Sequence, residues 1–452
     1  MSKILIFGAA PLPAEQQARR YAANLRTWQF TKALLDDGHE VRLIGCRLPN
    51  TYQDDSSLGR AAAIEVGDFE YLSVSGEVIE DTGFLQDQVE KFDPDALVGV
   101  TTYVASRAVK IETEIPIWCD LHGWIMAEAQ TKAHVYDDDQ YLSHFWKMEK
   151  AVLERADVIS TVSEPQAHAV VGELGVIGRL TRSTFGYRFA YPIPTATQDV
   201  DYTFSESVIR SGLVPPEAFV VLWVGGYNTW TDVDLLYGAL TKAMREVPEL
   251  HFVSTGGVID GHDEITFKRF QEMVGQDELR SRFHFVGWVP TRSVPSYYKE
   301  SDLGINIDSS SYEAVFGART RLNEMMHCGL PLLTTLGTEI SGQIADLGLG
   351  LCSPTGDVEA LAERMVWGAR NRNDIAMLAE KARDFVSEEL SYSKTTEQLR
   401  KWAQSPWRAP DLGERARFED VDSSRSPERD AEAGWRSLWL RCGRLFGRLR
   451  SG

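Results

Sequence analysis

The sequence predicts an α/β protein with two doubly wound parallel sheets, one in each half of the chain. Short runs of β-branched and other apolar residues alternate with helix-like stretches, which is typical of parallel strands covered by helices. This alternation occurs twice, and a polar, proline-bearing stretch at Tyr191–Ser205 separates the two series. A length of 452 residues also favours more than one domain. We therefore expect two similar domains with a ligand-binding cleft between them.

The first series begins with a strand at Lys3–Phe7 and a proline-bearing loop that starts at Gly8. A helix is expected from about Asn24 to Asp37, because its apolar residues recur at nearly 3.6-residue spacing and Gly38 follows. Further strands are expected at Glu40–Ile44, Ala96–Val100, Ile117–Asp120 and Val158–Thr161. We assign residues 1–200 to an N-terminal domain, completed by a helix that returns near residues 390–410.

The second series begins after Pro215-Pro216 with a strand at Phe219–Val224, a glycine loop and a helix at Asp234–Arg245. Further strands are expected at His251–Ser254, His284–Val286, Leu303–Ile307 and Leu332–Thr334. We assign residues 206–390 to a C-terminal domain of the same Rossmann-like type.

Composition narrows the function classes. Lys and Arg number 47 against 66 Asp and Glu, a net charge of −19, which argues against a general nucleic-acid binder. No apolar run is long enough to span a bilayer, and the first residues lack the pattern of a signal peptide. Five scattered cysteines without a C-x-x-C pair favour a reducing compartment and argue against a thiolate metal site. We expect a soluble cytoplasmic protein.

Two stretches of the second half contain candidate phosphate ligands. In Val221–Asp234 a strand leads into Gly225-Gly226 and then a helix, and such glycines permit close approach of a ligand to free backbone amides. This predicts a cradle for a nucleotide diphosphate; the alternative is an ordinary strand-to-helix turn. Farther on, Arg319 and Arg321 stand near a helix start, where the dipole disfavours cations unless an anion shares the site.

Glu324 lies about one turn beyond the arginines and could accept hydrogen bonds from a ribose diol. The alternative interpretation is that Arg319 and Arg321 are surface charges paired with Glu313 and Glu324.

Three motifs, taken in order, resemble the glycosyltransferases of family 4, which have the two-domain GT-B fold. They are GHEV at Gly38–Val41, FVGWVP at Phe285–Pro290, and E-x-x-x-C-G-L-P at Glu324–Pro331. The resemblance extends over about Lys3 to Gln404. It implies transfer of a sugar from a nucleotide diphosphate to an acceptor with retention of configuration and without a required metal or other cofactor. It also implies that the C-terminal domain binds the donor and the N-terminal domain the acceptor.

The resemblance guides the remaining site residues. His122 follows a strand end, where family members often have a histidine near the reacting carbon, and Asp120 could orient its imidazole. Arg26 could reach the donor phosphates from the opposite domain. A surface position for Arg26 and a structural role for His122 are the alternatives.

Two positions depart from the family pattern. The glutamate expected eight residues before Glu324 is Phe316, and Glu313 is the candidate substitute. The Arg and Lys that normally follow the first strand of the donor domain are absent from GGYNTWTD, so Arg319 and Arg321 are expected to neutralise the diphosphate. The departures leave two rivals open: a non-catalytic GT-B binding protein, or a nucleotide-sugar epimerase on the same fold.

The tail differs from the rest of the chain. Residues 411–434 are charged and Ser-rich, which predicts a disordered linker. Residues 435–450 have apolar side chains at three- and four-residue steps with arginines opposite, which predicts a basic amphipathic helix on an anionic membrane surface. Docking on this chain or a second copy is the alternative. We expect an enzyme of cell-surface polysaccharide or glycoconjugate synthesis, acting on a glycan or lipid-linked acceptor and peripheral to the cytoplasmic membrane face.

Overall fold

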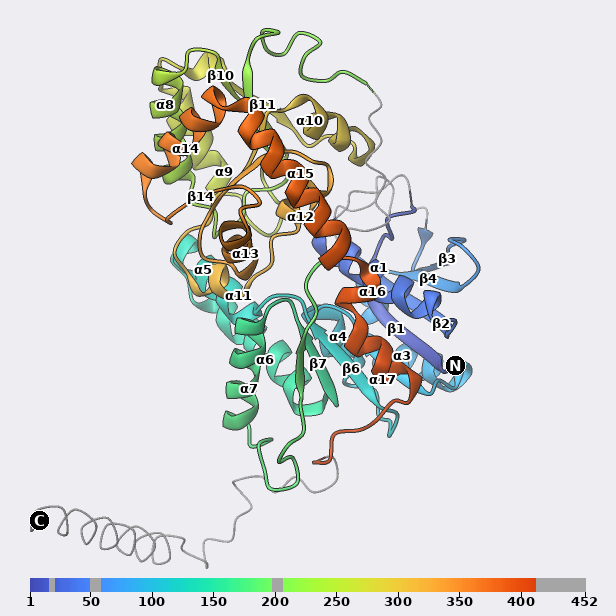
Figure 1. Ribbon diagram of the computed structural model, residues 1–452. Coiled ribbons are helices and arrows are strands. Elements are labelled where there is room, and N and C mark those ends of the chain that lie inside the picture. Colours follow the sequence, from blue (N-terminus) through green and yellow to red (C-terminus); the bar gives the residue numbers. More distant parts are fainter. Residues whose placement is uncertain (16–20, 49–57, 197–205, 412–452) are drawn as a thin grey trace, which may run out of the picture.

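The computed structural model describes residues 1–15, 21–48, 58–196 and 206–411 (Figure 1). Within this part, each half of the chain forms one mainly parallel sheet enclosed by helices, so the predicted fold class is confirmed. The expected amphipathic helix at 435–450, and the expected linker apart from Asp411, lie outside the described residues.

The first sheet has eight strands in the order β3-β4-β2-β1-β5-β6-β7-β8. All neighbours pair in parallel except β3 with β4. The strands are β1 (Lys3–Ala10), β2 (Glu40–Arg47), β3 (Ala61–Ala63), β4 (Glu70–Val74), β5 (Ala96–Gly99), β6 (Ile117–Leu121), β7 (Val158–Thr161) and β8 (Ala190–Pro192). The helices are α1 (Ala22–Asp36), α2 (Gly76–Ile79), α3 (Thr82–Phe92), α4 (Thr102–Ala108), α5 (Ile125–Tyr136), α6 (Gln140–Arg155) and α7 (Glu164–Val176). Helices cover both faces, which explains why central strands such as β1 and β5 are apolar without alternation.

The second sheet has six parallel strands in the order β11-β10-β9-β12-β13-β14. They are β9 (Phe219–Trp223), β10 (Leu250–Thr255), β11 (Phe283–Gly287), β12 (Leu303–Asn306), β13 (Leu332–Thr335) and β14 (Leu351–Ser353). The helices are α8 (Val233–Glu246), α9 (Thr266–Gly275), α10 (Val294–Glu300), α11 (Tyr312–Phe316), α12 (Thr320–His327), α13 (Glu339–Leu347), α14 (Val358–Arg370) and α15 (Arg372–Glu389). Two apolar clusters, one on each face, form its core.

The chain then returns to the first sheet. After α15, the short helices α16 (Tyr392–Thr395) and α17 (Glu397–Gln404) lie beside α1 (Figure 1). Trp402 is fully buried there and meets the ring of Trp118 edge-on at 5.6 Å. This packing fastens the C-terminal segment to the N-terminal domain.

Residues that follow strands of both sheets, such as His122 after β6 and Gly225 after β9, line one cleft between the domains. Hydrogen bonds cross it: the hydroxyls of Thr131 and Thr229 are 2.8 Å apart, and the amide of Glu264 donates to the hydroxyl of Tyr136 at 2.9 Å. The two domains are therefore in direct contact around the cleft. Within the described residues, no helix combines the length and apolar character needed to cross a bilayer.

Candidate active site

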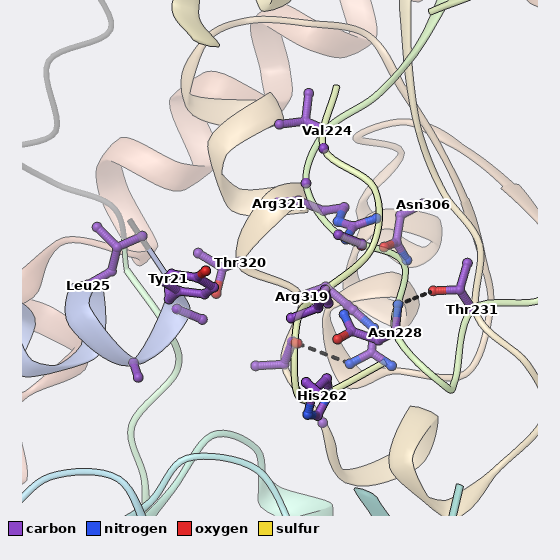
Figure 2. A pocket seen from close by; sticks show the side chains of 18 of the residues that line it. Tyr21, Leu25, Val224, Asn228, Thr231, His262, Asn306, Arg319, Thr320 and Arg321 are labelled. Atoms are coloured by element: carbon purple, nitrogen blue, oxygen red, sulfur yellow. Dashed lines mark hydrogen bonds between the residues drawn. The ribbon is translucent and has the colours of Figure 1, made fainter. Parts of the chain in front are cut away.

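A cleft of about 790 Å³ lies between the domains at the ends of β6, β9 and β12. Both domains line it, with Tyr21 and Leu25 of the first domain facing Thr320 and Arg321 of the second (Figure 2). Of the nine residues predicted for the site, seven line the cleft: His122, Gly225, Gly226, Glu313, Arg319, Arg321 and Glu324.

The glycine loop after β9 is one wall of the cleft. Gly225 has a φ of +93°, and a Cβ on Gly226 would come within 2.3 Å of the Ile259 side chain, so the loop requires glycine at both positions. The amide of Gly225 donates to the carbonyl of Thr255, whereas the amide of Gly226 has no acceptor in the described part of the chain. The predicted amide cradle is thus reduced to Gly226, because Gly225 is engaged with the neighbouring strand.

Arg321 lies against this loop. Its Nη2 donates to the carbonyl of Gly226 at 3.0 Å, and its guanidinium stacks on the Trp223 ring at 4.0 Å. Its Nη1 is buried without a hydrogen-bond partner among the described residues. Burial lowers the pKa of Arg321 to about 10, so the side chain remains cationic at neutral pH. A buried charged donor without an acceptor is costly, and an anionic ligand would satisfy it.

Arg319 has a different environment. Its Nε donates to Asp308 at 2.9 Å, and its Nη1 and Nη2 donate to Glu313 at 3.0 and 2.5 Å. Burial acts to lower the pKa of Arg319, but the two carboxylates raise it overall. The expectation that both arginines face the diphosphate therefore does not hold for Arg319. The positive charge of its guanidinium is balanced by the carboxylates of Asp308 and Glu313. The pairing with Glu313 is the one that the alternative interpretation predicted.

The start of α12 also faces the cleft. No side chain caps this helix end. The amide of Leu322 donates to the carbonyl of Arg319, so among the described residues the amides of Thr320 and Arg321 are the ones available to an anion. Glu324, one turn further, lines the cleft and accepts a hydrogen bond from the Tyr298 hydroxyl at 3.0 Å. Phe316, at the position of the missing family glutamate, has its ring edge-to-face with Trp124 at 5.0 Å. It presents an aromatic ring where the family has a carboxylate.

Two predicted residues lie behind the cleft wall. Arg26 and Asp120 have fully buried side chains, joined by hydrogen bonds of 2.7 and 3.1 Å. Arg26 also donates to the carbonyl of Ile193, and Asp120 accepts from Ser160. The expected reach of Arg26 to a donor phosphate is therefore wrong for this structure. Nor does Asp120 orient His122 by a hydrogen bond, because among the described residues its side-chain partners are Arg26 and Ser160.

His122 follows β6 and reaches the cleft as expected. Its Nε2 is buried without a hydrogen-bond partner in the described structure. Burial, together with the nearby Arg26 cation, lowers the pKa of His122 to about 4, although Asp120 opposes this. His122 is therefore a neutral imidazole at physiological pH, suited to a hydrogen bond with a ligand hydroxyl.

Glu128, on the first turn of α5, was not predicted as a site residue. Glu128 lines the cleft, and burial together with nearby Glu313 raises its pKa to about 8, with Arg319 opposing. No motif marks this position, since it is one glutamate in an otherwise ordinary helix. Trp230 and His262 also line the cleft and were not predicted, although Trp230 lies in the same glycine loop as Gly225 and Gly226.

Comparisons with known proteins agree with this architecture. A model described as Glycosyltransferase Family 4 matches residues 23–182, and one described as Glycosyl transferases group 1 matches residues 218–371. No curated protein matches the chain.

Solved structures with the same fold match about nine tenths of this chain. A sucrose-phosphate synthase from Thermosynechococcus elongatus has 15% sequence identity and a TM-score of 0.69, with 89% of this chain and 98% of that chain covered. HepE from Anabaena, in complex with UDP-glucose, has 14% identity and a TM-score of 0.63, with 90% and 100% covered. The trehalose-6-phosphate synthase OtsA has 11% identity and a TM-score of 0.65, with 90% and 100% covered.

The structural similarity to these proteins establishes the GT-B fold, and at such low identities it shows the fold alone. The two family models match the two domains separately. Since both domains match glycosyltransferase models and face one cleft, this chain belongs to the glycosyltransferases of family 4 and is an enzyme of nucleotide-sugar transfer.

Proposed function

We propose that the enzyme binds the diphosphate of its sugar donor between Arg321, the Gly226 amide and the first turn of α12. The observation that carries this proposal is the buried Nη1 of Arg321, a charged donor without an acceptor among the described residues. A phosphate oxygen would accept from it in a charge-assisted hydrogen bond. Glu324, one helical turn away, is placed to accept from the donor ribose.

The proposed reaction breaks the bond between the anomeric carbon and the phosphate oxygen, and the electron pair leaves with the diphosphate. Arg321 stabilises the charge that develops there, since its position is fixed before the reaction by Gly226 and Trp223. The acceptor hydroxyl attacks on the same face, and its proton goes to the leaving phosphate oxygen. This course retains the configuration and needs neither a protein nucleophile nor a metal. Neutral His122 would hold a sugar hydroxyl.

Turnover of nucleotide sugars tests the proposal. UDP-glucose is the first donor to try, because HepE of the same fold was solved with it. Arg321→Ala is expected to lower turnover at least tenfold, whereas Arg370→Ala, an exposed arginine on α14, leaves it unchanged. Equal turnover of all three proteins would contradict the role of Arg321.

We further propose a glycan or lipid-linked acceptor and association with an anionic membrane. The tail at 435–450 lies outside the described residues, but the point where it departs supports the proposal. Asp411 is buried in an ion pair with Arg179 at 2.7 Å. Near this ion pair, the last residue of α7 and the loop that follows it expose apolar side chains. They are Val176 on the helix and Leu180 and Phe185 in the loop, the last by 94%. Apolar side chains at the root of a basic amphipathic tail suit a lipid surface.

Flotation with vesicles that contain anionic lipid tests this association. The full chain is expected to float and a chain truncated after Asp411 to float less. Equal flotation would contradict a role for the tail. Loss of flotation in Phe185→Ser would add the loop to the contact.

A further inference from the structure

Two carboxyl groups from opposite domains meet near the start of α12. Glu128 stands on α5 of the N-terminal domain and Glu313 on α11 of the C-terminal domain, and both line the cleft. The two helices pack together, and Trp124, the residue just before α5, contacts Phe316 of α11 edge-to-face. The hydrogen bond of Thr131 to Thr229 holds the same face of α5 against the glycine loop. The position of Glu128 over the donor domain is therefore built into the domain contact.

The two carboxyl groups differ in their partners. Glu313 accepts two hydrogen bonds from Arg319, whereas the carboxyl of Glu128 accepts none from the described residues. Burial and the charge of Glu313 raise the pKa of Glu128 to about 8, against the opposing Arg319. At neutral pH Glu128 is consequently mostly a carboxylic acid, which can both donate and accept a hydrogen bond.

The direction of the bound donor follows from α12. The diphosphate is proposed to bind at Arg321. Glu324, proposed to bind the ribose, lies one turn closer to the C-terminal end of the helix. Arg319 is the residue just before α12, Glu313 is hydrogen-bonded to it, and Glu128 lies near both of their charges. The transferred sugar, attached to the other end of the diphosphate, would occupy this side. Phe316 offers it no polar group.

We propose that Glu128 hydrogen-bonds a hydroxyl of the transferred sugar and, with its neighbours, selects an uncharged sugar over the corresponding uronic acid. Glu128 would supply from the acceptor domain the carboxyl that the donor domain lacks at Phe316. The selection against acidic sugars follows from charge. Asp308 and Glu313 are two carboxylates against the single guanidinium of Arg319, so a third carboxylate on the sugar would be buried without a counter-charge. This inference rests on the proposed donor site.

Calorimetric binding to the full chain tests the selection. The probes are UDP, UDP-glucose and UDP-glucuronic acid, and in parallel GDP, GDP-mannose and GDP-mannuronic acid. For the nucleotide that binds, the neutral sugar derivative is expected to bind at least ten times more tightly than its uronic acid. Equal binding of the two sugars would overturn the selection and leave the proposed function standing. Failure of every nucleotide to bind would overturn both.

Variants of Glu128 test the contact itself. Glu128→Ala is expected to weaken binding of the neutral sugar nucleotide at least tenfold and to leave binding of the free diphosphate unchanged. Glu128→Gln should retain most of the affinity, because an amide also donates and accepts. Gln130→Ala, an exposed position on the same helix, is the matched control. Equal affinity of Glu128→Ala and the wild type for the sugar nucleotide would overturn the role of Glu128.

Discussion

Arg319 and Glu313 form a bidentate ion pair in the wall of the interdomain cleft, with N···O distances of 3.0 and 2.5 Å. Asp308 accepts from the same guanidinium on its other side. Arg321, two residues along, has instead a buried Nη1 with no partner in the part of the chain that the structure describes. The sequence does not distinguish these two arginines, but the structure does. Arg319 stabilises the cleft wall, and Arg321 is available to a ligand.

The first prediction separates the two arginines. Arg321→Ala should weaken binding of a nucleoside diphosphate by about 1.5–3 kcal/mol, the value of a lost charge-assisted hydrogen bond, and leave nucleoside binding almost unchanged. Arg319→Ala should lower the free energy of unfolding by about 3–5 kcal/mol, because two buried carboxylates lose their counter-charge. Calorimetry with both ligands and urea unfolding measure these effects. The reverse assignment, with Arg319→Ala stable and deficient only in diphosphate binding, would contradict the structure.

The second prediction concerns the ion pair of Arg26 with Asp120 behind the cleft. Arg26→Met should destabilise the fold by about 3–5 kcal/mol, since it leaves Asp120 charged and buried. The double variant with Asp120→Leu should lose much less than the sum of the single variants. The exposed pair of Arg370 with Glu246 is the control, with an expected loss of about 0–1 kcal/mol. Additive losses in the buried pair would show that the two charges do not depend on each other.

The third prediction concerns His122 and acid. In the folded state the pKa of His122 is about 4, below the ordinary 6.5. As the pH falls, His122 is therefore protonated in the unfolded chain before it is protonated in the folded chain. The associated stability is present above about pH 6.5 and is lost as the pH falls toward 4. His122→Asn should remove this contribution and also lower kcat, with the fold intact at pH 7. Melting curves between pH 4 and 7 check the first effect, and His168→Asn, an exposed histidine on α7, is the control. An unchanged pH dependence in His122→Asn would exclude the buried neutral imidazole.

The fourth prediction concerns Glu128 and base. Its folded-state pKa of about 8 lies above the ordinary 4.5, so its contribution to stability is full below about pH 4.5 and is lost as the pH rises through 8. Glu128→Gln should therefore gain stability relative to the wild type between pH 5 and 9, by at most about 5 kcal/mol. Urea unfolding across this range measures the difference.

Glu149 on α6 also lowers the stability of the fold as the pH rises, because burial raises the pKa of its carboxyl well above its usual value. If Glu128→Gln still loses stability as the pH rises, that remaining loss should become smaller in the double variant with Glu149→Gln. A constant difference between Glu128→Gln and the wild type at all pH values would contradict a protonated Glu128.

Local patterns in the sequence determined the fold and part of the site. Strands that are buried on both faces have continuous apolar sequences. The strands β1, β6 and β9 could therefore be predicted without knowing which strands pair with them. The spacing of Arg321 and Glu324 on one helix is local too, and the structure has both at the cleft. Short strands such as β3 and β14 were not predicted, since three residues are too few to make a pattern.

Charge partners were decided only by the tertiary structure. Arg26 and Asp120 are 94 residues apart, and no local pattern says that α1 and β6 bring them together behind the cleft rather than in it. The availability of Arg321 likewise depends on Asp308, which satisfies Arg319 from the end of a different element. Glu128 enters the cleft because α5 packs on α11 of the other domain. Secondary structure follows from residues that are neighbours in the chain, whereas the electrostatics of a site depends on distances of a few ångströms between elements that only the folded chain brings together.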